Sequence, residues 1–207
     1  MGPDVRKRPP RTRLDPEERR DQIIDAAEIA FQGRDPSEVT FEQVADRAGV
    51  SRALVYNYFG DKGGLLAAVY LRSVDRLDAQ LASSFAQHRP GPEQVKAIIG
   101  CYLDFAESDA HAVSLIVAAE ANVHPLIRDA RRQRYERMAH GWGHTPEARL
   151  LARGVIGLLE GAILDWLDAP VGERDRVQAE QVLFALLWSG LSGLADHNID
   201  LPRPPPD

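Results

Sequence analysis

The sequence predicts an all-α protein of about nine helices, in which a small three-helix unit precedes a larger helical domain. Apolar residues recur at helical spacing along most of the chain, and no segment alternates with the two-residue period of a β-strand. Residue pairs typical of helix starts, and glycines typical of helix ends, separate these stretches. With 207 residues, the chain is long enough to bury a core in both parts.

Composition indicates an intracellular setting. Cys101 is the single cysteine, so the chain has no disulfide framework of its own. The sequence shows neither a charged leader followed by an apolar run nor an apolar stretch of membrane-spanning length. We therefore expect a cytoplasmic protein without a membrane partner.

Positive charge gathers at the N-terminus, although the formal net charge is −6. Five basic residues and no acid lie between Val5 and Leu14, whereas residues 63–207 contain 14 basic and 19 acidic side chains. Residues 1–14 also contain three prolines and lack apolar periodicity. This segment is therefore predicted to be a disordered basic arm.

The first helix begins after Asp15. This residue and Glu18 have the spacing of a capping box, and Pro16 suits the first helical position. An apolar stripe then runs from Ile23 to Phe31, and Gly33 is typical of a helix end. Together these features predict one amphipathic helix that buries a single face.

Two short helices follow, joined by a tight turn. Thr40 and Gln43 form a second capping box, and Gly49 fits a left-handed cap at the end of that helix. Ser51 can cap the next helix, which covers residues 52–59. A helix, a glycine-containing turn and a second helix make a helix-turn-helix pattern.

The segment from Thr40 to Lys62 resembles the helix-turn-helix of the tetracycline-repressor family. The shared features are the Gly-Val-Ser turn, Tyr56, the Tyr58-Phe59 pair and Lys62. The resemblance covers about residues 16–66 and implies a dimeric transcriptional regulator. It also implies a DNA-binding domain over residues 15–62 and a ligand-sensing and dimerisation domain over residues 63–207.

Helical geometry independently predicts which side of the third helix faces outward. Val55 and Phe59 are four residues apart and would face the core, which leaves the opposite side free to enter a major groove. On that side, Arg52 can contact guanine, Ala53 a thymine methyl group and Asn57 adenine or a phosphate. A plain packing unit with solvated charges is the alternative interpretation.

Phosphate contacts are expected from hydroxyl groups and from one ammonium group, because such contacts fix the position of the protein on DNA. By resemblance, Tyr56, Tyr58 and Lys62 are the strongest candidates. The complete predicted DNA-binding set is Thr40, Ser51, Arg52, Ala53, Tyr56, Asn57, Tyr58 and Lys62.

The sequence departs from the family pattern at two places. Leu54 replaces a small or hydroxylated residue, so one contact with DNA is in doubt. Gly63 and Gly64 stand where a Glu-rich helix start is usual, and each glycine costs about 1 kcal/mol relative to alanine within a helix. They indicate either a hinge or simply a weak first turn.

Longer helices are predicted beyond this point. A connecting helix covers residues 65–87, shorter helices cover about 93–107, 109–121 and 124–140, and two strongly apolar helices cover 146–168 and 173–196. The last two carry several glycines that permit close backbone approach, and we expect them to form a four-helix interface in a homodimer. Ordinary packing within one chain is the alternative.

A small-molecule pocket is expected between the middle helices, with apolar walls and a few polar groups. The residues predicted to contact this unidentified effector are Tyr102, Phe105, Glu120, His124 and Trp166. Glu120 and His124 have metal-ligand spacing, but no second pair accompanies them, so neither a metal nor another cofactor is predicted.

Five arginines recur in a short basic stretch of the middle region. They are Arg128, Arg131, Arg132, Arg134 and Arg137. The favoured interpretation is a solvated helix face, and an anionic ligand or a partner surface is the alternative.

The expected function is that of a ligand-responsive repressor that binds a palindromic operator as a dimer. A ligand-independent regulator and an activator are alternatives. No catalytic motif supports an enzyme, since the sequence lacks a phosphate-binding glycine loop, a His-Glu-x-x-His motif and a nucleophile elbow.

The basic arm generates a first prediction. If residues 1–13 contact DNA phosphates, deleting them will reduce the slope of the logarithm of the binding constant against the logarithm of salt concentration. Fluorescence-anisotropy titrations at several salt concentrations measure that slope. An unchanged slope would show that the arm makes no contact with DNA.

Overall fold

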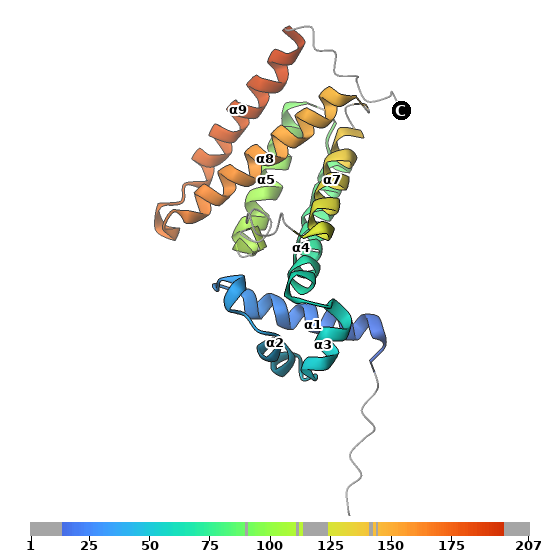
Figure 1. The fold of residues 1–207 in the computed structure, drawn as a ribbon. Coiled ribbons are helices and arrows are strands. Elements are labelled where there is room, and N and C mark those ends of the chain that lie inside the picture. Colours follow the sequence, from blue (N-terminus) through green and yellow to red (C-terminus); the bar gives the residue numbers. More distant parts are fainter. Residues whose placement is uncertain are drawn as a thin grey trace, which may run out of the picture. The chain divides into compact units, whose positions relative to one another are not determined.

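A computed structural model describes residues 14–89, 91–110, 112–113, 124–140, 143 and 145–196. These residues form eight α-helices and two short 3-10 helices and contain no strand, in agreement with the predicted all-α fold (Figure 1). The chain divides into two compact units, residues 1–60 and residues 61–207. No helix within the described ranges is both long and apolar enough to cross a membrane.

The first unit contains the three predicted helices, and their starts are confirmed. Helix α1 spans Pro16–Phe31, α2 spans Phe41–Ala48 and α3 spans Arg52–Phe59, with a 3-10 helix, η1, at Pro36–Glu38. Both capping boxes are present, with Asp15 capping α1 and Thr40 capping α2. These caps satisfy backbone N–H groups that a helix start otherwise leaves unpaired.

The core of the first unit follows the predicted stripes. Ile23, Ala27 and Phe31 of α1 are fully buried, as are Val44 of α2 and Val55 of α3. Small side chains on α1 and α2 allow the helices to pack closely, so a core this small still excludes water.

The second unit begins with α4, which spans Lys62–Gln87. This helix begins three residues before the expected start at residue 65, and the two compact units divide after Gly60, whereas the sequence predicted a DNA-binding domain that ends at Lys62. The Asp61 carboxylate accepts a hydrogen bond of 2.8 Å from the Gly64 N–H. This cap stabilises the first turn despite its two glycines.

The remaining helices of this unit are α5 (Pro92–Ser108), α7 (Pro125–His140), α8 (Pro146–Asp168) and α9 (Arg176–Asp196). Helix α8 covers the expected range. The last helix begins three residues later than predicted, because Val171–Glu173 form a separate 3-10 helix, η3, after Pro170. Proline lacks the N–H that would continue a regular helix there.

The core of the second unit joins α4, α5, α7, α8 and α9. It contains Tyr70 and Leu77 of α4, Leu103 of α5, Ile127 of α7 and Leu159 of α8, with residues of α9 packed against it. These five side chains are almost completely removed from solvent. Their packing fixes α4, α5, α7 and α8 around one centre, and Figure 1 shows α9 alongside α8.

A network of charged groups crosses this core. Arg134 of α7 donates to Asp78 of α4 at 2.8 Å, to Glu160 of α8 at 2.7 Å and to the hydroxyl of Tyr102 of α5 at 2.8 Å. Arg131 donates to the second oxygen of Glu160 at 2.8 Å. One cation thus connects α7 to three other helices.

The prediction of a solvated arginine face was therefore wrong for part of the basic stretch. The side chains of Arg134 and Glu160 are each only 5% exposed, whereas Arg132 remains 66% exposed. Burial alone lowers the pKa of the Arg134 guanidinium, but the Tyr102 oxygen and the two carboxylates outweigh this and raise the pKa above its usual value. Arg134 therefore remains charged inside the protein.

Breaking this network should destabilise the second unit. Arg134→Met leaves two carboxylates without their shared cation, and we expect the free energy of unfolding to fall by about 3 kcal/mol. Urea denaturation followed by circular dichroism measures the change. Arg132→Met on the same helix is the control, and its effect should stay below about 0.5 kcal/mol. Equal losses for the two variants would contradict a structural role for the buried charge.

Candidate DNA-binding and ligand-binding sites

The turn between α2 and α3 is held by backbone geometry. Gly49 adopts a φ of 65°, a left-handed conformation that a residue with a Cβ atom adopts at a cost. The N–H of Val50 donates to the carbonyl of Ala45 at 2.9 Å, which closes the end of α2. Ser51 then caps α3 by accepting from the N–H of Leu54 at 3.2 Å. The chain reverses within three residues, so α3 starts at a fixed angle to α2.

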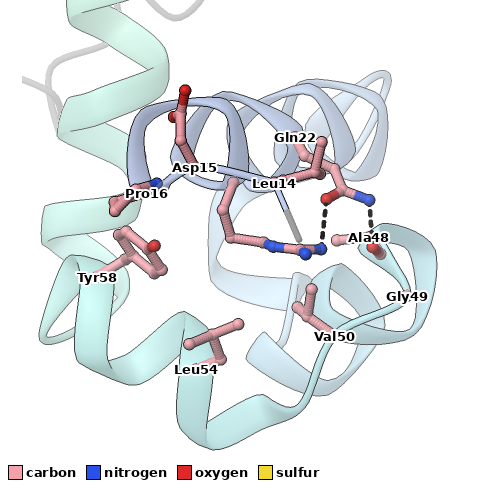
Figure 2. Close-up of a pocket in the computed structure, with 10 residues that line it drawn as sticks. Leu14, Asp15, Pro16, Gln22, Ala48, Gly49, Val50, Leu54 and Tyr58 are labelled. Atoms are coloured by element: carbon pink, nitrogen blue, oxygen red, sulfur yellow. Dashed lines mark hydrogen bonds between the residues drawn. The ribbon is translucent and has the colours of Figure 1, made fainter. Parts of the chain in front are cut away.

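Helix α1 holds this turn from the other side. The side-chain amide of Gln22 donates to the carbonyl of Ala48 at 2.9 Å, and Arg19 donates to the Gln22 oxygen at 2.8 Å (Figure 2). The carbonyl of Ala48 lies at the end of α2, where no helical partner is available. Arg19 and Gln22 therefore fix α1 against the helix-turn-helix.

The outward face of α3 has the composition that the sequence predicted. Arg52, Ala53 and Asn57 are exposed, and Tyr56 is 60% exposed, whereas Val55 is fully buried. The ring of Tyr56 meets that of Phe41 edge-on with 6.0 Å between centroids. An exposed tyrosine that is held by a neighbouring ring keeps its hydroxyl in a defined position.

Thr40 and Ser51 have a dual capacity. Both residues are exposed, and each hydroxyl oxygen accepts a backbone N–H at the start of its helix. A capping hydroxyl of this kind retains its own proton for donation. Either hydroxyl can thus cap its helix and donate to a phosphate oxygen at the same time.

A wide groove separates the first half of α1 from the turn and α3. Its volume is about 1120 Å³, and its walls include Pro16 of α1 and Leu54 and Tyr58 of α3 (Figure 2). Arg19 of α1 also lines it. Arg19 supplies a cation here that the predicted DNA-binding set does not contain. No pattern in the sequence distinguished Arg19 from the neighbouring Arg20, since its place depends on the contact of Gln22 with the end of α2.

Lys62 does not belong to the first unit. It is the first residue of α4, it is half-buried, and it belongs to the second unit together with Asp61. Its contact with DNA stays a prediction. The four hydroxyl-bearing candidates Thr40, Ser51, Tyr56 and Tyr58 all belong to the first unit.

In the second unit, a cavity of about 220 Å³ lies between α4, α5, α7 and α8. Of the predicted ligand-contacting residues, Tyr102 lines it. Phe105 is 2% exposed and belongs to the core, and the half-buried Trp166 ring lies 5.6 Å from the Arg174 guanidinium at the end of α8. Glu120 lies outside the described residues.

His124 occupies a structural position at the start of α7. Its ring nitrogen Nδ1 accepts from the Leu126 N–H at 3.3 Å, and its carbonyl accepts from Ile127 and Arg128 at 3.1 Å each. The ring also approaches Gly63, where a Cβ atom would come within 3.0 Å of the imidazole Cδ2. Gly63 thus makes room for His124, which neither sequence interpretation of the two glycines considered. Within the described ranges, no cluster of three metal-ligating side chains occurs.

Comparison with known proteins places these features in a family. The family described as "Bacterial regulatory proteins, tetR family" matches residues 23–69. The HTH-type transcriptional activator FasR of Mycolicibacterium smegmatis is 30% identical over 193 residues, which cover 87% of this chain and 86% of that protein. The HTH-type transcriptional regulator BetI of Pectobacterium carotovorum is 27% identical over 80% of this chain and 88% of its own length.

A solved structure shows the same architecture. A tetR-family transcriptional regulator from Streptomyces coelicolor superposes with a TM-score of 0.65 at 28% identity, over 90% of this chain and 86% of that chain. The similarity therefore covers both units and extends well beyond the helix-turn-helix.

The groove of the first unit generates a prediction about Arg19. Arg19→Ala should weaken binding to operator DNA about fivefold and reduce the salt slope by about 1, because one phosphate contact is lost. Arg34→Ala removes the same charge from an exposed position that does not line this groove, and it should leave both quantities unchanged. Anisotropy titrations of the two variants measure the affinity for operator DNA and the salt slope. If both quantities are the same for the two variants, Arg19 makes no specific contact with DNA.

Proposed function

The chain belongs to the tetR family of bacterial regulatory proteins and is a helix-turn-helix transcriptional regulator, and from this premise we propose that it is a ligand-responsive repressor that binds a palindromic operator as a homodimer. The observation that carries the proposal is the exposed face of α3, which offers side chains suited to base edges next to hydroxyl groups suited to phosphates. We place this activity in the cytoplasm, where a bacterial regulator meets the chromosome.

Arg52, Ala53 and Asn57 are the proposed base-reading residues. An extended arginine can bind O6 and N7 of guanine through two hydrogen bonds, and asparagine can bind N6 and N7 of adenine in the same way. Tyr56, Tyr58 and Lys62 are proposed to contact phosphates, joined by Arg19. In this proposal, residues up to Lys62 serve DNA recognition and residues from Gly63 onward serve sensing and dimerisation.

Two exposed apolar stripes support the proposed dimer. On α8, Leu150 is 73% exposed, and Gly154, Gly157 and Gly161 follow on the same face with only open space around the position of an added Cβ atom. On α9, Val182 is 52% and Leu186 is 56% exposed. Exposed apolar side chains in a continuous stripe favour association, and glycines let helices approach closely.

A homodimer places two copies of α3 on one DNA molecule. Recognition helices spaced about 34–36 Å apart meet successive major grooves on one side of the duplex, so a two-fold dimer reads a palindrome. A ligand that binds better to a differently spaced dimer releases the DNA, and it shifts the equilibrium only by its difference in affinity for the two forms. The cavity between α4, α5, α7 and α8 is the proposed ligand site.

Activation is a second candidate function. It is favoured by the name of the relative from Mycolicibacterium smegmatis, a transcriptional activator that matches most of this chain. Purified RNA polymerase and a template that contains the operator separate the two cases, because a repressor lowers transcript yield and an activator raises it. A repressor additionally predicts that the operator overlaps the promoter.

The test of the function is binding to the DNA upstream of its own gene, followed by fluorescence anisotropy. Tyr56→Ala should weaken binding about tenfold or more and lower the free energy of unfolding by no more than about 1 kcal/mol, because the exposed side chain contacts Phe41 edge-on. Val171→Ala, an exposed substitution in η3 of the second unit, is the matched control and should bind normally. If the wild-type protein shows no salt-sensitive binding to this DNA, it does not regulate that promoter.

A charged substitution on the exposed stripe of α9 tests the proposed dimer interface. Leu186→Glu places a carboxylate in the centre of the α9 stripe, and we expect it to convert the protein to a monomer at micromolar concentration, since an unpaired charge opposes burial in an interface. Light scattering after gel filtration measures the mass. Val171→Glu introduces the same charge at a residue that is 80% exposed outside the stripe, and this variant should remain a dimer. A Leu186→Glu variant that stays dimeric would place the interface elsewhere.

A further inference from the structure

The cavity of the second unit has an apolar body and one polar end. Its apolar walls come from all four surrounding helices, and they include Phe85 of α4, Ile98 of α5, Met138 of α7 and Ile156 of α8. Four polar residues complete the lining, namely Asp78, Tyr102, Arg134 and Arg137. A ligand that fills this space must therefore be apolar over most of its length and polar at one end.

The polar end offers hydrogen-bond donors. Asp78 is the only acid among the described residues that line the cavity, and both of its oxygens already accept, one from Arg134 and the other from Arg137. A cation entering here would find that carboxylate occupied and would lie beside two guanidinium groups. A positively charged ligand head is therefore disfavoured.

Tyr102 supplies a donor with no acceptor of its own. Its hydroxyl oxygen accepts from Nη2 of Arg134 at 2.8 Å, and among the described residues none accepts its proton. The residue is 4% exposed, and burial raises the pKa of the hydroxyl above its usual value, so the proton stays in place. A buried donor without a partner costs free energy, and an acceptor on a ligand would recover that cost.

Arg137 supplies positive charge within reach of solvent. Its side chain is 57% exposed, whereas that of Arg134 is 5% exposed. A guanidinium group has five N–H donors, and only one of those on Arg137 is used in its bond to Asp78. The remaining N–H groups can donate to the two oxygens of a carboxylate.

We propose that this cavity binds a carboxylic acid with an apolar body, with its carboxylate at Arg137 and the Tyr102 hydroxyl. This assignment rests on the proposed function and names the class of effector for the same site. A cavity of about 150 Å³ accommodates benzene, so by proportion 220 Å³ holds about nine carbon atoms. The ligand is thus a medium-chain fatty acid or an arylalkanoic acid of similar size.

Calorimetric titration of the full-length protein tests the chemistry of the ligand. The probes are octanoate and 3-phenylpropanoate, which both carry a carboxylate but differ in having an aliphatic or an aromatic body. The controls are 1-octanol and octylammonium, which replace the carboxylate by a neutral or a positively charged group. At least one of the two acids should bind, about tenfold or more tightly than the alcohol, because charge-assisted hydrogen bonds are about twice as strong as neutral ones. Equal affinity for acid and alcohol, or binding of octylammonium in preference, would overturn the proposal.

Two variants test the location. Arg137→Gln should weaken binding of the acid about tenfold and leave binding of the alcohol unchanged, since only the charged contact is removed. Arg132→Gln removes the same charge from α7 at a residue that does not line the cavity, and it should have no effect. Ala82→Phe, at an exposed residue of the lining, should block both ligands by filling the space. Equal effects of the two arginine variants would overturn the assignment of the site.

The anisotropy assay, run on the same preparations, separates this inference from the proposed function. A protein that binds upstream DNA but neither acid overturns the ligand assignment and leaves the DNA-binding function standing. A protein that binds octanoate or 3-phenylpropanoate with an unchanged DNA affinity supports the assignment and contradicts ligand-responsive regulation through this cavity.

Discussion

The second unit depends on one buried cation. Arg134 connects α7 to α4, α5 and α8 through hydrogen bonds to two carboxylates and one hydroxyl. Because Arg134, Glu160 and Tyr102 are almost completely buried, their mutual positions are much more restricted than those of a surface ion pair. Three of these residues, Asp78, Tyr102 and Arg134, also line the cavity, so the interaction that holds the helices together includes groups of the proposed ligand site.

The proposed ligand site adjoins the contacts between α4 and α7. In the proposed complex, the ligand carboxylate lies next to Asp78, which pairs with both Arg134 and Arg137. Since Asp78 lies on α4, a change in its pairing alters the contact between α7 and the helix that follows the helix-turn-helix. At the first turn of α4, His124 packs against Gly63, so α7 contacts α4 at a second place.

The first unit is stabilised by a different kind of interaction. Its helices start at capping side chains that lie within three residues of the groups they satisfy, and its turn requires a left-handed glycine. The one long-range hydrogen bond described between α1 and the end of α2 is that of Gln22 with Ala48. Local interactions thus set each helix, and a small buried core sets their packing.

The sequence by itself determined the fold class, the helix-turn-helix and the exposed face of α3. Capping pairs, glycine turns and helical periodicity depend on residues near one another in the chain, so Asp15, Thr40, Gly49 and Val55 could be interpreted without coordinates. Only the tertiary structure decided that Arg134 is buried and that Tyr102 lines the cavity whereas Phe105 belongs to the core. Periodicity gives the side of a helix on which a residue lies but not the partner it meets, and the partners of Arg134 lie 26 to 56 residues away.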